Sequence, residues 1–380
     1  MKKTLALLLA AVSIILSGCG HSGIYSNYRR TEHLLLVQAL GIDTLGEDIT
    51  LSVSCAKPAR ESSAAIISRS GGSILSAMSS LQKFSADAQL YYSHGEYVLM
   101  GEDYARRQSP RLFDFLARDN QLRLGIYLFV VKGGEAGELI TGVEDSSYEI
   151  SKTLSGIRRD SEKQGAGRVF TARETLRSLS THGAALICAI EKRPTEDSVY
   201  LMKAGVTAVE SGYGVLKDGL LVGFLDRELS QGANLILGHL GSEGPTLPDG
   251  RGGKLTVQYE GGSAKIIPHK SADGGLDHIE IAGKIKATLS EPDTDTLHVT
   301  DRDFLSSLEE AISEDMERRI AMLLEVSRSM DADFLGLKSH LRGCQIPENW
   351  LQEAEFRIAC QSEISYTREL GDKMNPRGQG

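Results

Sequence analysis

Cys19 is the residue of this chain whose surroundings point most directly to a chemical reaction. A basic start at residues 1–3 precedes an almost unbroken apolar run from Thr4 to Leu16, and small residues lead from there to the cysteine. Basic, apolar and small segments in this order are typical of an export signal. The run is shorter than the roughly 20 residues that span a bilayer, so a transmembrane helix is the weaker interpretation.

The four residues Leu16-Ser17-Gly18-Cys19 resemble the bacterial lipobox. The resemblance implies that the Cys19 thiol is lipidated, that cleavage makes Cys19 the new N-terminus, and that this N-terminus is acylated. The alternative is an ordinary signal peptide that happens to contain a cysteine. The favoured interpretation makes residues 1–19 the signal and 20–31 a polar spacer. The rest is then a body tethered to the outer face of a membrane.

Composition narrows the function of that body. The chain has 380 residues, of which 41% are hydrophobic and 24% charged, as in an ordinary globular protein of two or three domains. The formal charge of −9 argues against nucleic acid as a partner. No segment after the signal is apolar enough to cross a membrane, so lipid is the anchor that the sequence offers.

The other reactive residues do not form a recognisable site. Cys55, Cys188, Cys344 and Cys360 contain no CxxC pair, which argues against a zinc or redox motif, although Cys344 and Cys360 could pair if the fold allows it. The histidines are dispersed, and acid pairs such as Glu309-Glu310 are expected on the polar face of a helix. We therefore predict no catalytic residue, no metal site and no cofactor.

One short match to an enzyme motif remains. Ser80 to Lys83 has the SxxK spacing of a nucleophilic serine, but neither SDN nor KTG follows it. The match falls at the end of a helical stripe that begins at Ile74. We interpret it as a chance match, and the chain as a protein without enzymatic activity.

The first half of the body mixes helices and strands without a strict βαβ rhythm. Leu34–Leu40 fits a buried strand or the start of a buried helix. Residues 56–72 have little periodicity and are predicted to form an exposed loop. Further strands are predicted at 49–55, 89–99, 126–131 and 184–190, and helices at 74–81, 103–107, 110–116, 146–158 and 171–180. The charged stretch 191–198 is predicted to link two domains.

The second half shows hairpins and one long helix. Asp218-Gly219 is typical of a type I′ turn, and Gly261-Gly262 is predicted to turn a second hairpin. An amphipathic helix over 300–323 should pack on a sheet that includes strands at 278–289 and 356–366. We predict an α+β fold with mixed or antiparallel sheets, an N-terminal region at 32–190, a C-terminal domain at 199–370 and a disordered tail at 371–380.

Several segments, in order, resemble the Ger(x)C family, the lipoprotein C subunit of spore germinant receptors. Residues 28–43, ending in Gly41-Ile42-Asp43, and residues 101–119 carry the resemblance in the first half. The hairpin at 214–225 and the stretch 331–337, with Pro347 and Trp350 downstream, carry it in the second. Phe224 stands where the family is expected to have tryptophan, and Gly20 follows Cys19 where tryptophan is often found. These departures indicate a divergent member of the family.

The resemblance implies a non-enzymatic, lipid-anchored subunit on the outer face of the spore inner membrane. It implies membrane-spanning A-type and B-type receptor subunits as partners, and α+β domains. A solute-binding lipoprotein of a transporter is the alternative, but that fold needs repeated βα units in two lobes. A lipid-anchored envelope enzyme is the third possibility, and it lacks a catalytic set. Phe334 and Trp350 are expected in the core of the C-terminal domain.

Overall fold

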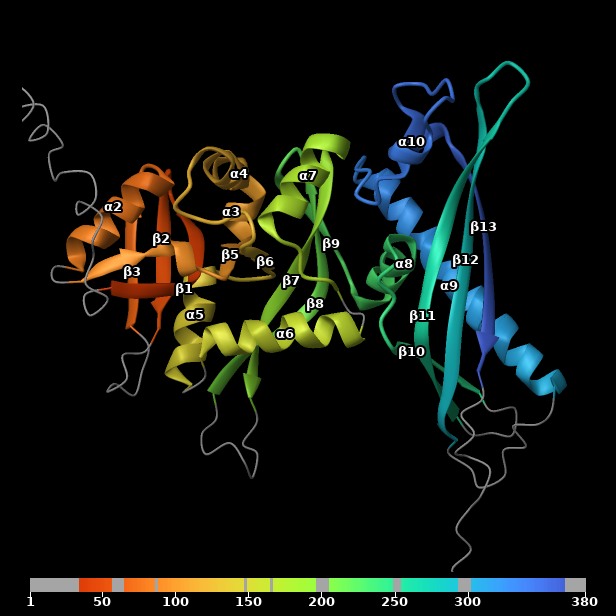
Figure 1. Ribbon diagram of the computed structural model, residues 1–380, viewed down its shortest axis with the longest axis horizontal. Coiled ribbons are helices and arrows are strands. Elements are labelled where there is room, and N and C mark those ends of the chain that lie inside the picture. The colour runs from red at the N-terminus through yellow and green to blue at the C-terminus, as the bar shows by residue number, and fades with distance from the viewer. Residues whose placement is uncertain are drawn as a thin grey trace, which may run out of the picture.

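The computed structural model describes residues 34–56, 65–85, 88–146, 149–164, 167–195, 205–248, 254–292 and 302–365. Two sheets lie side by side along the long axis of the molecule, as Figure 1 shows. The first sheet contains the N-terminal strands, and the second the C-terminal ones. The α+β prediction is confirmed, with both sheets mixed and flanked by helices.

Nine strands among the described residues form the large sheet, in the order β3-β2-β1-β5-β6-β7-β8-β9, with β4 also paired to β1. Strands β1, β5, β6 and β7 are parallel, and the pairs at the two ends are antiparallel. The strands are β1 Leu34–Leu45, β2 Asp48–Cys55, β3 Ala65–Gly71, β4 Gln89–Tyr91, β5 Tyr97–Gly101, β6 Tyr127–Val131, β7 Ala184–Thr195, β8 Gly205–Lys217 and β9 Leu220–Leu225.

Helices cover both faces of the large sheet, because its central strands are apolar on both sides. One face packs against α2 Ile74–Phe84, α3 Glu102–Arg107, α4 Ser109–Arg118 and α7 Ala172–His182. The other face packs against α5 Ala136–Asp145 and α6 Ile150–Gln164. A short 3-10 helix, η2 Tyr92–His94, joins β4 to β5.

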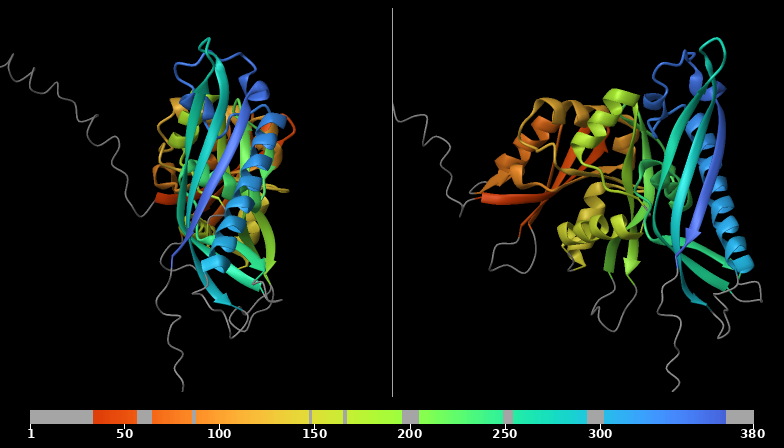
Figure 2. Two further views of the ribbon diagram at one scale, coloured as in Figure 1. Left: turned by 90° about the vertical axis from the view of Figure 1, so that its right-hand side faces the viewer. Right: turned by 45° about the vertical axis from the view of Figure 1, so that its right-hand side comes forward.

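The second sheet has the order β10-β11-β12-β13, in which β13 is parallel to β12 and the other pairs are antiparallel. Helices α8 and α9 pack on this sheet. The hydrophobic core between them also includes residues of the turns before β13. The elements are α8 Arg227–Leu237, β10 Glu243–Pro248, β11 Lys254–Lys270, β12 Leu276–Pro292, α9 Arg302–Ser329, η3 Leu337–His340, α10 Trp350–Glu353 and β13 Glu355–Ile364. Figure 2 shows α9 running diagonally beside β13.

The long helix is confirmed as an amphipathic element of the C-terminal core. Its buried positions recur at helical spacing: Leu305, Leu308, Ile312, Met316, Ile320, Leu323 and Leu324. Phe334 and Trp350 are also confirmed as core residues, with exposed fractions of 3% and 5%. Burial of this stripe against the sheet supplies the main driving force for the helix, as expected for amphipathic helices in proteins.

The predicted linker at 191–198 is wrong for residues 191–195. These residues belong to β7 and pair with β8 as far as Thr195↔Gly205, whereas 196–198 lie outside the described residues. The charged side chains suggested a loop, but they lie at an exposed end of the sheet. The large sheet therefore continues through β8 and β9 to Leu225.

Two other local predictions are corrected by pairing between strands. Residues 65–71 of the predicted loop form β3, an edge strand paired with β2. Gly261-Gly262 does not turn the chain: β11 runs through it, with a bulge at Gly261 where φ is +152°. A Cβ at Gly262 would lie 2.7 Å from the Leu235 side chain, so the glycine lets α8 approach. Helix α5 was not predicted from the sequence.

Candidate functional site at the junction of the two sheets

The predicted lipidation site, Cys19, lies outside the described residues, as do the signal, the spacer at 20–31 and the tail at 371–380. The remaining cysteines are free thiols, so Cys344 and Cys360 do not form a disulfide. Burial raises the pKa of the Cys55 and Cys360 thiols to about 12, which keeps both protonated and unreactive near neutral pH.

The structure shows the surroundings of the short enzyme-like match at Ser80 and of the side chains that could bind a metal. The Ser80 hydroxyl donates to the Ser76 carbonyl within α2, at 3.0 Å. No group of three or more histidine, cysteine, aspartate or glutamate side chains in the described ranges could hold a metal ion. Of the helices described, none has the length and apolarity needed to cross a membrane.

The hairpin of β8 and β9 forms one end of the large sheet, and there it contacts other parts of the protein. Its turn is confirmed, because both Asp218 and Gly219 have positive φ angles, of 51° and 83°. The buried Ser109 hydroxyl donates to the Gly219 carbonyl at 2.6 Å, and a Cβ at Gly219 would lie 3.3 Å from Phe113. Helix α4 therefore holds the hairpin turn in place.

Phe224 on β9 lies beneath two cations. The Arg106 guanidinium lies 5.7 Å and the Lys132 ammonium 5.4 Å from its ring centroid. Glu102 holds Arg106 through an ion pair at 2.7 Å and accepts the Gly133 N–H at 2.6 Å. Two of the segments that carried the family resemblance thus meet around one aromatic ring.

The segment 330–337 contacts the same hairpin from the C-terminal side. Lys217 and Asp331 form an ion pair at 2.8 Å, and a Cβ at Gly223 would collide with the Met330 side chain. Gly336, with φ at +70°, leaves room for the ring of His182 at the end of α7. We call these contacts, together with those of Tyr213 below, the junction.

The junction also contains the buried hydroxyl of Tyr213. This hydroxyl accepts the Arg168 N–H and donates to the Asn234 side chain, both at 2.6 Å. Arg168 in turn pairs with Glu174 of α7 at 2.7 Å. One tyrosine therefore joins β8, α8 and the loop before α7. Sequence reasoning missed this residue because its partners are 45 and 21 positions away, and no local pattern signals them.

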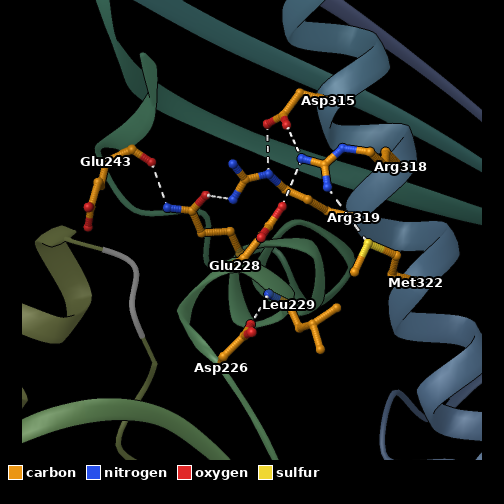
Figure 3. A network of polar contacts seen from close by, with 9 residues as sticks. Asp226, Glu228, Leu229, Glu243, Asp315, Arg318, Arg319 and Met322 are labelled. Carbon is orange, nitrogen blue, oxygen red and sulfur yellow. Dashed lines mark hydrogen bonds and ion pairs between the residues drawn. The ribbon is translucent and has the colours of Figure 1, made fainter.

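A polar network ties α8, α9 and β10 together, and Figure 3 shows it from close by. Asp315 accepts from Arg318 at 2.6 Å and from Arg319 at 2.7 Å. Arg319 donates to Gln231 at 2.6 Å, and Gln231 donates to the Glu243 carbonyl at 2.9 Å. These bonds satisfy polar groups that α8 and α9 bury where they pack.

Helix α9 also closes the outer edge of β13. The backbone N–H groups of Cys360, Ser362 and Ile364 donate to side chains of Glu317, Ser313 and Glu309 at 2.7, 3.1 and 2.9 Å. Four residues of helix advance about 6.0 Å and two residues of strand about 6.6 Å, so the two ladders nearly match. Glu309 is thus a partner of the strand and not the purely solvated charge that was expected. The ladder prevents this edge from pairing with another chain.

Asp43 is the last residue of the N-terminal segment of resemblance, and its carboxylate holds the start of helix α5. Its carboxylate accepts the N–H groups of Ala136 and Gly137 at the start of α5, each at 2.8 Å. Burial raises the pKa of Asp43 to about 6, against the effect of these two hydrogen bonds. A Cβ at Gly101 would collide with the Asp43 carboxylate, so both segments of resemblance are needed for this contact.

Glu210 is a partly buried acid, and one oxygen of its carboxylate is fully buried. Among the described residues, its Oε1 atom has no hydrogen-bond partner. Burial raises the pKa of Glu210 to about 8, with Arg227 acting in the opposite direction and Glu243 adding to the rise. The side chain lies beside Gly167, near the start of the strand segment that leads to Tyr213. It is therefore a titrating group on β8, the strand of Tyr213, that the sequence did not indicate.

Comparison with known proteins gives two family matches that together span most of the chain. Residues 27–192 match the family model described as the spore germination protein N-terminal domain. Residues 211–368 match the model described as spore germination B3/GerAC-like, C-terminal. No curated protein matches the sequence.

One solved structure shares the fold. The crystal structure of the GerBC protein matches with a TM-score of 0.54 and 19% sequence identity. The match covers 86% of this chain and 96% of the GerBC chain. At this identity the likeness concerns the fold alone.

Proposed function

Because the chain belongs to the family of spore germination proteins whose N- and C-terminal domain models it matches, we propose that it is the lipoprotein C subunit of a nutrient germinant receptor. It acts without enzymatic activity, as a protein–protein module beside the membrane-spanning A-type and B-type subunits. The observation that carries the proposal is the pair of family matches, in order. They follow a segment that resembles an export signal ending in a lipobox.

The anchor is the second part of the proposal. Cys19, lipidated at its thiol and at its new N-terminus, holds the body on the outer face of the spore inner membrane. A single acyl chain gives only marginal membrane binding, whereas two or more signals give stable anchoring. A cysteine that carries a diacylglycerol and an N-acyl group meets that requirement without any contribution from the folded body.

The contacts made by the segments that resemble the family support a protein–protein module rather than an enzyme. Asp43 holds α5, Phe224 lies beneath cations from α3 and the β6–α5 turn, and Asp331 pairs with the hairpin. Each contact positions one element against another. Residues that hold elements against one another fix the shape of the protein. A subunit of a complex needs such a fixed shape to bind its neighbours.

The test is purification from spore inner membranes, followed by mass spectrometry of the proteins that co-purify. We expect a membrane protein with a soluble N-terminal domain and a transporter-like multi-spanning protein. Recovery of an ATP-binding cassette permease in their place would support the solute-binding alternative and overturn the proposal. The neighbouring genes should encode the same two membrane proteins.

The anchor is tested separately with Cys19→Ala. We expect an unlipidated precursor and weaker nutrient-triggered germination, with the folded body unchanged. Cys344→Ala is the matched control, because Cys344 is a partly exposed free thiol far from the signal in the sequence. Normal membrane retention and normal germination of the Cys19 variant would refute the role of the anchor.

A further inference from the structure

A cleft of about 460 Å³ opens where α7 of the large sheet faces the C-terminal segment 334–342. Its size lies within the range of small-molecule sites, about 300–1,000 Å³. Residues of α7 and β7 form one wall, and the end of α8 with the segment 334–342 forms the other. A molecule in this cleft would therefore touch both parts of the protein at once.

Two arginines and one glutamate are the charged side chains of the cleft, beside serine, threonine and histidine side chains. Arg177 projects from α7, and Arg342 from the opposite wall. Within the residues that the structure describes, neither guanidinium group has a hydrogen-bond or ion-pair partner. The acid that lines the cleft, Glu174, is paired with Arg168 at 2.7 Å and accepts two hydrogen bonds from Thr171 at 2.8 Å. Its charge is thus balanced outside the cleft.

The spacing of the α7 residues explains why one helix face is available. Glu174, Arg177 and Thr181 recur at intervals of three and four, and so share a face. The opposite face of α7 packs on the sheet through Ala172, which is fully buried. The arginine is therefore presented to the cleft by the amphipathic pattern of the helix.

Four apolar side chains also line the cleft. Phe170 and Leu186 come from the large sheet and its loop, and Leu237 and Phe334 from the C-terminal part. Two arginines above an apolar surface fit one class of ligand. The guanidinium groups suit a carboxylate, because their donors match its geometry. The apolar residues suit an aromatic or branched aliphatic body.

We propose that this cleft binds a small organic anion, with its carboxylate between Arg177 and Arg342 and its apolar body against Phe170 and Phe334. The bound molecule bridges the large sheet and the C-terminal part. A ligand that contacts both walls binds only while the two walls face each other. Its binding therefore stabilises the junction described above. This inference goes beyond the proposed receptor role and does not depend on it.

The experiment uses the full-length chain in an uncharged maltoside detergent. Phenylacetate, benzoate, hexanoate and 3-methylbutanoate are titrated by isothermal calorimetry, with phenylacetamide and inorganic phosphate as comparison probes. We expect saturable binding of at least one carboxylate below about 10 mM. The amide should bind about tenfold or more weakly, because it lacks the charge. Phosphate should also bind more weakly, because it lacks the apolar body.

Variants assign the binding to the cleft. Arg177→Ala and Arg342→Ala should each weaken carboxylate binding by about tenfold or more. Arg173→Ala is the matched control, because Arg173 is an exposed residue of α7 that does not line the cleft. Far-UV circular dichroism must show that the three variants are folded alike. The single tryptophan, Trp350, should report a higher unfolding midpoint when the carboxylate is bound.

Four results would each overturn the proposal. The first is that none of the four carboxylates binds saturably up to about 20 mM, and the second is that phenylacetate and phenylacetamide bind equally well. The third is that phosphate binds more tightly than any carboxylate. The fourth is that the Arg173 and Arg177 variants lose equal amounts of carboxylate affinity. The failure of this test would leave the co-purification of receptor subunits unaffected, and the reverse also holds.

Discussion

The Glu210→Gln substitution should make the protein more stable, and by an amount that depends on pH. Burial raises the pKa of Glu210 from 4.5 to about 8, so folding favours its protonated form. Below pH 4.5 the side chain is protonated in both the folded and the unfolded state, and it costs nothing. As the pH rises from 4.5 towards 8, the unfolded state gains stability by ionising while the folded state does not.

The size of the effect follows from the difference between the two pKa values. Each unit is worth about 1.4 kcal/mol, so the 2.5 units between 4.5 and pH 7 lower the free energy of unfolding by about 3 kcal/mol. Glutamine keeps the size of the side chain but cannot ionise. The Glu210→Gln variant should therefore be about 3 kcal/mol more stable than the parent at pH 7, and nearly equal to it at pH 4.5.

The assay is urea unfolding at pH 4.5, 7 and 8, followed by Trp350 fluorescence and by far-UV circular dichroism. Glu47→Gln is the control, because Glu47 is an exposed acid in the β1–β2 turn, and its variant should differ little from the parent at any of these pH values. The reasoning is refuted if Glu210→Gln changes stability equally at pH 4.5 and pH 8. It is also refuted if the variant is the less stable protein at pH 8.

Substitutions at three further residues test the packing and the polar contacts, each by the urea unfolding of folded variants. Phe334→Ala should cost ~3–5 kcal/mol, because it removes a buried aromatic ring, and a loss below about 1 kcal/mol would place Phe334 outside the core. Glu317→Ala should cost about 1–3 kcal/mol by leaving the Cys360 N–H without its acceptor. Glu317→Gln retains an acceptor oxygen and should recover most of that loss; equal losses would rule out the edge contact. Lys217→Ala should cost less than about 1 kcal/mol, because its ion pair with Asp331 is partly exposed, and a larger loss would show that this pair holds the junction.

Periodic segments were predicted well because their signal is local. The stripe from Leu305 to Leu323 predicted α9, and Asp218-Gly219 predicted a turn whose two positive φ angles the structure shows. Alternation likewise predicted β12 and β13. In each case neighbouring residues carry the whole pattern, so no knowledge of distant partners was needed.

The errors lie where distant partners decide the structure. The charged residues of 191–195 form a strand because β8 pairs with them, and Gly261 lies within a long strand because β12 continues on both sides of it. The edge strand β3 has little alternation and exists through its pairing with β2. Local composition favoured a loop or a turn at all three places, and hydrogen bonds across the sheet outweighed it.

The lipidation of Cys19 stays a prediction from the sequence, and it rests on consecutive residues that resemble an export signal and a lipobox. The order of the family-like segments was also evident there. Their purpose depends on tertiary structure: Asp43 meets α5 some 93 residues later, and Tyr213 joins Arg168 to Asn234. The cleft between Arg177 and Arg342 likewise exists because folding brings two walls together from positions far apart in the chain. Contacts of this kind depend on how the elements pack, and residues adjacent in the sequence do not indicate that packing.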